Sequence, residues 1–249
     1  MPLPKIAALT LNVSDPARLA AFYCEALGMK RIAGGDTLAI GYGGDGANLV
    51  FLPAKGTAPH RIGPNDRYWK IAITVPDLDC AYRQLRARGI EVTAPNQFRD
   101  IAYMSHLADP EGYTVELIQH TFGGNDLTRQ GDDALPLGGG ARLGLITLRT
   151  GDLETEFTTC RDQLGMRYLS RQDVPDLDFC LYFLAFTDET PPLPDVDAVE
   201  NREWLWQRPY TVLEFQHRKQ GHIVCRADGQ QGAAAVRIKN PDGRQTILC

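Results

Sequence analysis

The sequence has no long apolar run and no closely paired cysteines. None of its apolar runs reaches the roughly 18 residues that a membrane-spanning helix needs, and Met1–Lys5 begin no signal-peptide core. The six cysteines are scattered without CxxC spacing, which is typical of reduced thiols rather than of a disulfide framework. We therefore expect a cytoplasmic protein that does not associate with membranes.

Signals for nucleic-acid and nucleotide chemistry are also missing. The net charge of −5 weighs against binding to nucleic acid or to an anionic membrane surface. No glycine-rich nucleotide motif follows a predicted strand, and no Ser/His/Asp order indicates a nucleophile elbow. The hydrophobic content of 43% is ordinary for a globular protein. The expected partner is therefore a small-molecule ligand, and the expected state is a monomer or a homodimer.

The first half of the chain repeats one order of elements, a strand and a helix followed by three short strands. Ser14 or Asp15 can cap the first helix, Pro16 suits its first turn, and Gly28 ends it. The predicted elements of the first unit are strand 5–13, helix 16–27 and strands 29–33, 37–42 and 47–53. After a loop at 53–67, the second unit has strand 70–75, helix 78–88 and strands 90–93, 102–108 and 113–120.

Three short motifs of the first half recur in the second half. Leu148–Asp152 matches Leu11–Asp15, Leu164–Met166 matches Leu27–Met29, and Asn240–Gly243 matches Asp109–Gly112. Such an internal repeat predicts two related halves of two units each. We place them at residues 1–122 and 140–249, joined by a Gly-rich, acidic linker at 123–139.

The fourth unit is shorter than the others. Lys70 and Asp109 are 39 positions apart, whereas His222 and Asn240 are 18 apart, so roughly 21 residues are missing. That length corresponds to one helix and one strand, and we expect no helix between His222 and Asn240. The third unit instead contains a long Pro-rich loop at 188–203, and loops of that length often serve as lids.

The repeated units resemble the vicinal oxygen chelate superfamily, which includes glyoxalase I, bleomycin resistance proteins and extradiol dioxygenases. The resemblance rests on Leu-Gly-Met after the first helix and on an Asp-Pro-Glu-Gly turn before a strand that carries a glutamate. The second half is closest to glyoxalase I. The resemblance implies an α+β fold of four βαβββ modules, the fourth degenerate, which form two half-open barrels. One such architecture hosts many chemistries.

In this family a metal is held by residues at four strand positions of a barrel. The resemblance places these positions at Ala8, approximately Val50, Lys70 and Glu116 in the first half, and at Leu145, Glu214, His222 and Ile247 in the second. Neither set offers the three or more side-chain ligands that zinc, nickel or iron (Zn, Ni or Fe) requires. The two-His, one-Glu set of extradiol dioxygenases is missing as well. We expect no metal, or a weakly bound divalent metal at Glu214 and His222.

How the modules pair determines which of these ionisable residues lie in the same cavity. If each half closes on itself, Lys70 faces Glu116 and His222 faces Glu214. If the halves exchange modules, Lys70, Glu116 and Glu214 meet in one cavity and His222 lies in the other. We favour the self-closed arrangement because it pairs the charges more evenly, and unpaired buried charges are costly.

The function that we expect is that of a glyoxalase-like enzyme that transfers a proton next to a carbonyl of a small oxygenated substrate. Glu116 or Glu214 would be the base, and Lys70 would stabilise the oxyanion. The candidate substrate-binding residues are Thr10, Thr147, Arg149, Trp206 and Tyr210. His106 is a candidate catalytic residue if its strand face points inward. The alternatives are a metal-free binding protein for an aromatic or antibiotic-like ligand, and a dioxygenase-like protein with degenerate metal sites.

Overall fold

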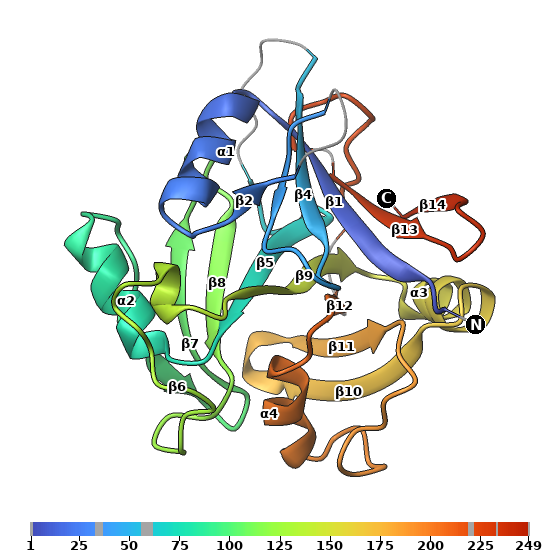
Figure 1. Cartoon of the computed structure of the whole chain (residues 1–249). Coiled ribbons are helices and arrows are strands. Elements are labelled where there is room, and N and C mark those ends of the chain that lie inside the picture. Colours follow the sequence, from blue (N-terminus) through green and yellow to red (C-terminus); the bar gives the residue numbers. More distant parts are fainter. Residues whose placement is uncertain (1, 33–36, 56–61, 219–221, 233, 249) are drawn as a thin grey trace.

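Two β-sheets organise the part of the chain that the structure describes (Figure 1). The structure is a computed structural model, and it describes residues 2–32, 37–55, 62–218, 222–232 and 234–248. The predicted loop at 53–67 therefore lies partly outside the described residues, at 56–61. Among the described residues, no helix is long and apolar enough to cross a membrane.

The six-stranded sheet combines the first module with the fourth. Its order is β14-β13-β1-β4-β3-β2, and β1 pairs antiparallel with β13 and parallel with β4. The strands are β1 (Lys5–Val13), β2 (Lys30–Arg31), β3 (Ala39–Gly41), β4 (Asn48–Pro53), β13 (Ala234–Lys239) and β14 (Gln245–Leu248).

The eight-stranded sheet combines the second module with the third. Its order is β10-β11-β12-β9-β5-β8-β7-β6, and it is continuous because β5 and β9 pair antiparallel, with Ile71 opposite Ile146. The strands are β5 (Tyr68–Val75), β6 (Asn96–Phe98), β7 (Ala102–Ala108), β8 (Thr114–Gln119), β9 (Arg142–Thr150), β10 (Arg167–Val174), β11 (Phe179–Ala185) and β12 (Val212–Arg218).

This pairing shows that the self-closed arrangement is wrong. The halves exchange modules, since each sheet takes one module from either side of the linker. The predicted fold class is confirmed: three complete βαβββ modules and a degenerate fourth form two sheets, and the eight-stranded one curls into a half-barrel. Within the described residues between Gln119 and Arg142 there is no strand, only the short turn η1 (Pro136–Gly138).

An aspartate caps the helix of each complete module. Asp15, Asp77 and Asp152 accept hydrogen bonds from backbone N–H groups three residues ahead, at 3.0, 2.9 and 3.0 Å, and so satisfy donors that the first turn leaves free. The helices are α1 (Pro16–Glu25), α2 (Leu78–Ala87) and α3 (Leu153–Phe157), the last continued by the π-turn η2 (Thr158–Gln163).

The fourth module lacks its helix, as the length of the sequence predicts. Over residues 222–232 and 234–239 the described chain has turns, one isolated bridge at Val224 and then β13, but no helix. The turn Asn240–Gly243 joins β13 to β14. His222 does not open a strand of the sheet. Its segment runs instead beside Asp66, which bridges to Val224.

Two local predictions differ from the structure. The strand predicted at 90–93 is reduced to a single bridge between Val92 and Leu107, and β6 forms later, at Asn96–Phe98. The Pro-rich loop contains a helix, α4 (Glu200–Trp206). Asn201 stabilises this region, because its amide group accepts from the N–H of Leu193 and donates to the carbonyl oxygens of Leu193 and Asp195.

Candidate active site

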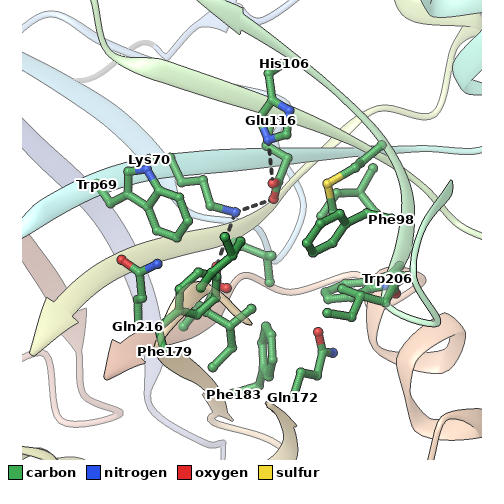
Figure 2. A pocket seen from close by; sticks show the side chains of 17 residues that line it. Trp69, Lys70, Phe98, His106, Glu116, Gln172, Phe179, Phe183, Trp206 and Gln216 are labelled. Carbon is green, nitrogen blue, oxygen red and sulfur yellow. Dashed lines mark hydrogen bonds and ion pairs between the residues drawn. The ribbon is translucent and has the colours of Figure 1, made fainter. Parts of the chain in front are cut away.

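A cavity of about 270 Å³ lies against the eight-stranded sheet (Figure 2). Strands β5, β7, β8, β10, β11 and β12 contribute to its walls, and α4 covers one side with Trp206. Most of its lining is aromatic or aliphatic. The labelled aromatic residues are Trp69, Phe98, Phe179, Phe183 and Trp206. This combination of an apolar lining and a few converging polar groups is typical of small-molecule sites.

Five neighbouring strands, in the order β12-β9-β5-β8-β7, bring the central polar side chains together. In the register of the sheet, Lys70 on β5 lies opposite Thr147 on β9, which lies opposite Glu214 on β12. On the other side of β5, Glu116 on β8 pairs with Ala72 and with His106 on β7. Residues two apart share a strand face, so Lys70 and Ala72 lie on the same face of β5. The residues paired with Lys70 and those paired with Ala72 therefore face the same cavity.

Lys70 lies between two carboxylates. Its Nζ forms an ion pair with Glu116 Oε2 and lies 3.7 Å from Glu214 Oε2. The three side chains are 2–5% exposed, and Lys70 Nζ also lies 4.7 Å from the ring centroid of Trp69. Burial alone would lower the pKa of Lys70, but the two carboxylates raise it above its ordinary value. The ammonium therefore stays charged.

Glu116 is held in its ionised form. Burial alone would raise the pKa of Glu116, but the Lys70 charge and the contact with His106 lower it to about 2. His106 Nε2 lies 2.9 Å from Glu116 Oε1, and the His106 side chain is 38% exposed. Glu116 therefore acts as the permanent counterion of Lys70 and is a weak base. His106 lines the cavity, so its strand face points inward.

Glu214 has the opposite electrostatic character. Burial raises its pKa, and although Lys70 and the hydroxyl of Thr147 favour the ionised form, the Glu116 charge disfavours it, so the pKa stays above the ordinary value. The Thr147 hydroxyl donates a hydrogen bond to Glu214 Oε2. The environments of the two carboxylates thus separate their pKa values, which is typical of acid–base sites.

Two further predicted residues belong to this cavity or support it. Trp206 lines it and donates from Nε1 to the Ile101 carbonyl at 3.1 Å. Arg149 lies behind the wall: its Nε donates to Gln216 Oε1 at 2.9 Å, and its guanidinium lies 4.9 Å from the Trp69 ring centroid. Arg149 is therefore placed to act through Trp69 and Gln216, which do line the cavity.

Three predicted residues lie elsewhere. Thr10 is buried in the six-stranded sheet, where its hydroxyl accepts from Arg237 Nε at 2.8 Å. Tyr210 donates to Glu189 at 2.7 Å beside a separate hollow. His222 is exposed and lines another hollow, so the expected pairing of His222 with Glu214 is not found. The reason is that the fourth module pairs with the first in the six-stranded sheet, whereas Glu214 lies on β12 of the eight-stranded sheet.

Sequence reasoning missed several residues that line the cavity, Gln172 above all. Gln172 lies on β10 and is completely buried. Alternation along Arg167–Val174 puts it on the same face as Ser170 and Val174. A large polar side chain on the buried face of a strand is unusual and could have identified it. Phe179 and Gln216 were missed as well, because their role depends on which modules pair.

The side chains at the four family metal positions do not form a suitable set for a transition metal. In the observed pairing these positions in the cavity are Lys70, Glu116, Leu145 and Glu214. Two of them offer a carboxylate, one is an aliphatic side chain, and the Lys70 ammonium stands between the carboxylates as a cation in its own right. Zinc, nickel and iron need more N, O or S ligands than this. Among the described residues, no group of three or more His, Cys, Asp or Glu side chains could hold a metal ion.

We expect the purified protein to contain less than one equivalent of tightly bound transition metal, because the Lys70 ammonium repels a divalent cation from the two carboxylates. The measurement is elemental analysis after dialysis against a chelator. The control is the Lys70→Ala variant, in which the two carboxylates lose their cation and should bind added Zn²⁺ more tightly than the wild type does. Stoichiometric zinc, nickel or iron in dialysed wild-type protein would contradict this prediction.

Comparison with known proteins agrees with the resemblance seen in the sequence. Residues 5–117 match the model of the Glyoxalase/Bleomycin resistance protein/Dioxygenase superfamily. A lactoylglutathione lyase from Arabidopsis thaliana is 26% identical over 268 residues, which cover 95% of this chain and 88% of that protein. Glyoxalase I from Zea mays superposes with a TM-score of 0.64 at 22% identity, over 88% of this chain and 69% of that one. A variant of the maize enzyme superposes with a TM-score of 0.65 at 19% identity, over 98% and 93%.

The chain thus contains a domain of the Glyoxalase/Bleomycin resistance protein/Dioxygenase superfamily at residues 5–117, and nearly its whole length has the fold of glyoxalase I. The curated relative is a lyase by name, which favours an enzyme over a binding protein.

Proposed function

We propose that this protein is a glyoxalase-type lyase or isomerase that transfers a proton at a carbon next to a carbonyl of a small oxygenated substrate. One observation carries the proposal: a buried lysine ammonium lies between two carboxylates, one held ionised and the other with a raised pKa. The similarity to a lactoylglutathione lyase over 95% of the chain supports the same class of reaction.

The division of roles follows from the electrostatics of the three groups. Glu214 in its ionised form takes the proton from the carbon, and the electrons of the C–H bond move onto the carbonyl oxygen. The Lys70 ammonium stabilises the resulting enolate oxygen by charge and hydrogen bonding. Glu214 then returns the proton to the former carbonyl carbon, while the proton of the neighbouring hydroxyl moves to the former carbonyl oxygen, so that the hydroxyl carbon becomes the new carbonyl. Glu116 keeps Lys70 protonated throughout, since its own pKa of about 2 makes it a weak base.

The charge of the site does not change during this transfer. The Lys70–Glu116 ion pair is neutral, and the site carries one further negative charge. This charge is on Glu214 before the step and on the substrate oxygen after it. Both positions adjoin Lys70, whose Nζ lies 3.7 Å from Glu214 Oε2. A negative charge that moves between two positions beside one fixed cation requires little reorganisation of its surroundings, which is the condition for electrostatic catalysis.

A second candidate function is that of a metal-free binding protein for an aromatic molecule. The lining of the cavity favours it, because Trp69, Phe98, Phe179, Phe183 and Trp206 provide far more apolar than polar contact. The two functions need the same cavity, but only the enzyme needs Glu214 to exchange a proton with its ligand.

Deuterium exchange separates the two functions. Lactoylglutathione and a series of aromatic 2-hydroxy ketones are incubated with the protein in D₂O, and binding of each compound is followed in parallel by thermal shift. We expect incorporation of deuterium next to the carbonyl, detected by NMR, for a compound that also raises the melting temperature. The Glu214→Gln variant should bind that compound without exchange. Compounds that bind the wild type and never exchange would replace the enzyme with the binding protein.

A further inference from the structure

Gln172 is a completely buried polar side chain whose amide has no partner within the described residues. Neither its Nε2 nor its Oε1 forms a hydrogen bond there, and the side chain lines the cavity. A buried amide without hydrogen bonds costs stability. Figure 2 shows Gln172 on the side of the cavity where Phe183 and Trp206 lie. Those aromatic rings give a lone water molecule few further polar contacts, so a ligand group is the better partner.

Gln172 lies at some distance from the proton-transfer groups. In the register of the sheet it pairs with Leu181, which pairs with Gln216, and Glu214 is two residues before Gln216 on the same face of β12. Neighbouring strands are ~4.8 Å apart, so the two strand spacings from β10 to β12 separate Gln172 from Gln216 and Glu214 by roughly 10 Å. The cavity therefore has one polar end at Lys70 and Glu214 and another at Gln172.

The space between the two polar ends is apolar and aromatic. Leu181 and Phe183 on β11 line it, and the ring of Phe183 packs edge-on against Trp206 with centroids 5.7 Å apart. Flat rings on a cavity wall favour a ligand with an aromatic body, because aromatic groups pack edge-to-face or offset against one another.

The charged lining residues are confined to one end. They are Lys70, Glu116 and Glu214, with His106 beside them. A charged ligand group at the Gln172 end would be buried without a counterion, which is costly. A carboxamide offers an N–H donor and a carbonyl acceptor together. Its complement is a neutral group with both functions, such as a hydroxyl or an amide.

We propose that Gln172 is a recognition subsite for a neutral hydroxyl or amide group at the far end of an aromatic substrate whose carbonyl oxygen lies beside Lys70. The placement of the carbonyl rests on the proposed function, whereas the subsite itself rests on Gln172 and the aromatic walls. The structure thereby selects an aromatic 2-hydroxy ketone with a distal hydroxyl over a substrate with charged ends.

Calorimetry with a matched pair of compounds tests the subsite. The probes are 2-hydroxy-1-phenylethanone and its derivative with a hydroxyl at the para position of the ring. We expect the wild type to bind the para-hydroxy compound about tenfold more tightly, as one additional hydrogen bond in a desolvated site provides. Gln172→Leu should abolish this preference and leave the affinity for the unsubstituted compound within about twofold.

The Glu214→Gln variant keeps the subsite and removes the proton carrier, so it should show the same tenfold preference without turnover. A preference without turnover in the wild type would retain the subsite and reject the proposed enzyme. Equal affinities in the wild type, a preference that persists in Gln172→Leu, or failure of both compounds to bind at millimolar concentration would each overturn the subsite.

The stability of the free protein provides a second readout. Gln119 is a matched control, because it is also buried but its amide is satisfied: its Oε1 accepts from the Leu78 N–H at 3.1 Å, and its Nε2 donates to the Thr121 carbonyl at 3.2 Å. Gln119→Leu should lower the melting temperature, whereas Gln172→Leu should leave it unchanged or raise it. A larger loss in Gln172→Leu than in Gln119→Leu would show that Gln172 serves the fold and would overturn the proposal.

Discussion

Replacing Glu214 with glutamine is expected to lower kcat by about 10²- to 10⁴-fold, the usual contribution of a general acid–base group. Glutamine has nearly the same shape and can accept the hydrogen bond from Thr147, so the cavity should keep its geometry. It cannot take up a proton. The measurement is single-turnover kinetics on a substrate identified by deuterium exchange, with ligand affinity determined separately.

The matched control is Glu116→Gln. Glu116 has a pKa of about 2 and serves as the counterion of Lys70, so its loss should reduce stability more than it reduces the rate of proton transfer. If Glu116→Gln lost as much activity as Glu214→Gln at equal stability, the division of roles between the two carboxylates would be wrong.

The pH profile gives the same assignment a second test. The base must be ionised, and burial raises the pKa of Glu214 above that of an exposed glutamate. In the free enzyme kcat/KM should therefore fall as the pH drops through this raised pKa, and this acidic limb should lie above the range of ordinary carboxylates. An activity that stays constant down to the pKa of an exposed glutamate would exclude Glu214 as the base.

Replacing Lys70 with methionine is expected to lower the free energy of unfolding by roughly 3–5 kcal/mol, the usual cost of leaving one partner of a buried ion pair alone. The variant keeps a side chain of similar length but leaves Glu116 and Glu214 buried without a cation, since both are at most 5% exposed. Burial then disfavours ionisation, so the carboxylates should take up protons. Chemical denaturation measures the loss.

The double variant Lys70→Met with Glu116→Leu should be more stable than Lys70→Met alone, because it removes one of the two uncompensated carboxylates. In the wild type, the stabilisation from Glu116 should be present at neutral pH and disappear as the pH falls from about 4.5 to about 2, since folding lowers its pKa. Strictly additive losses in the two single variants and the double variant would mean that the side chains do not interact.

Much of the fold could be predicted from the sequence because local patterns carry it. The strand at 5–13 was predicted, and the candidate cap Asp15 marked where the first helix begins. The shortened fourth module was visible as a simple difference in length. Helix α4 was missed because a Pro-rich segment precedes it and its N-cap residue, Val199, provides no side-chain hydrogen bond.

The candidate site was predictable only in part. Glu214 could be named from the sequence as an ionisable residue within an apolar strand, and Lys70 and Glu116 because the family resemblance places them at metal positions. Their meeting in one cavity could not be derived, since both module arrangements use the same local elements and differ only in whether β5 pairs with β9. The argument from charge pairing failed because one lysine can serve two carboxylates when one of them has a raised pKa.

The sequence by itself determined the modules, the missing helix and the ionisable residues, because each of these depends on residues that are close together in the chain. Only the tertiary structure decided that Glu214 joins Lys70, that His222 stays apart, and that Gln172 faces the cavity without a partner. These three results depend on contacts between strands that are far apart in the chain. Such contacts are decided by which modules pair with each other in the folded protein.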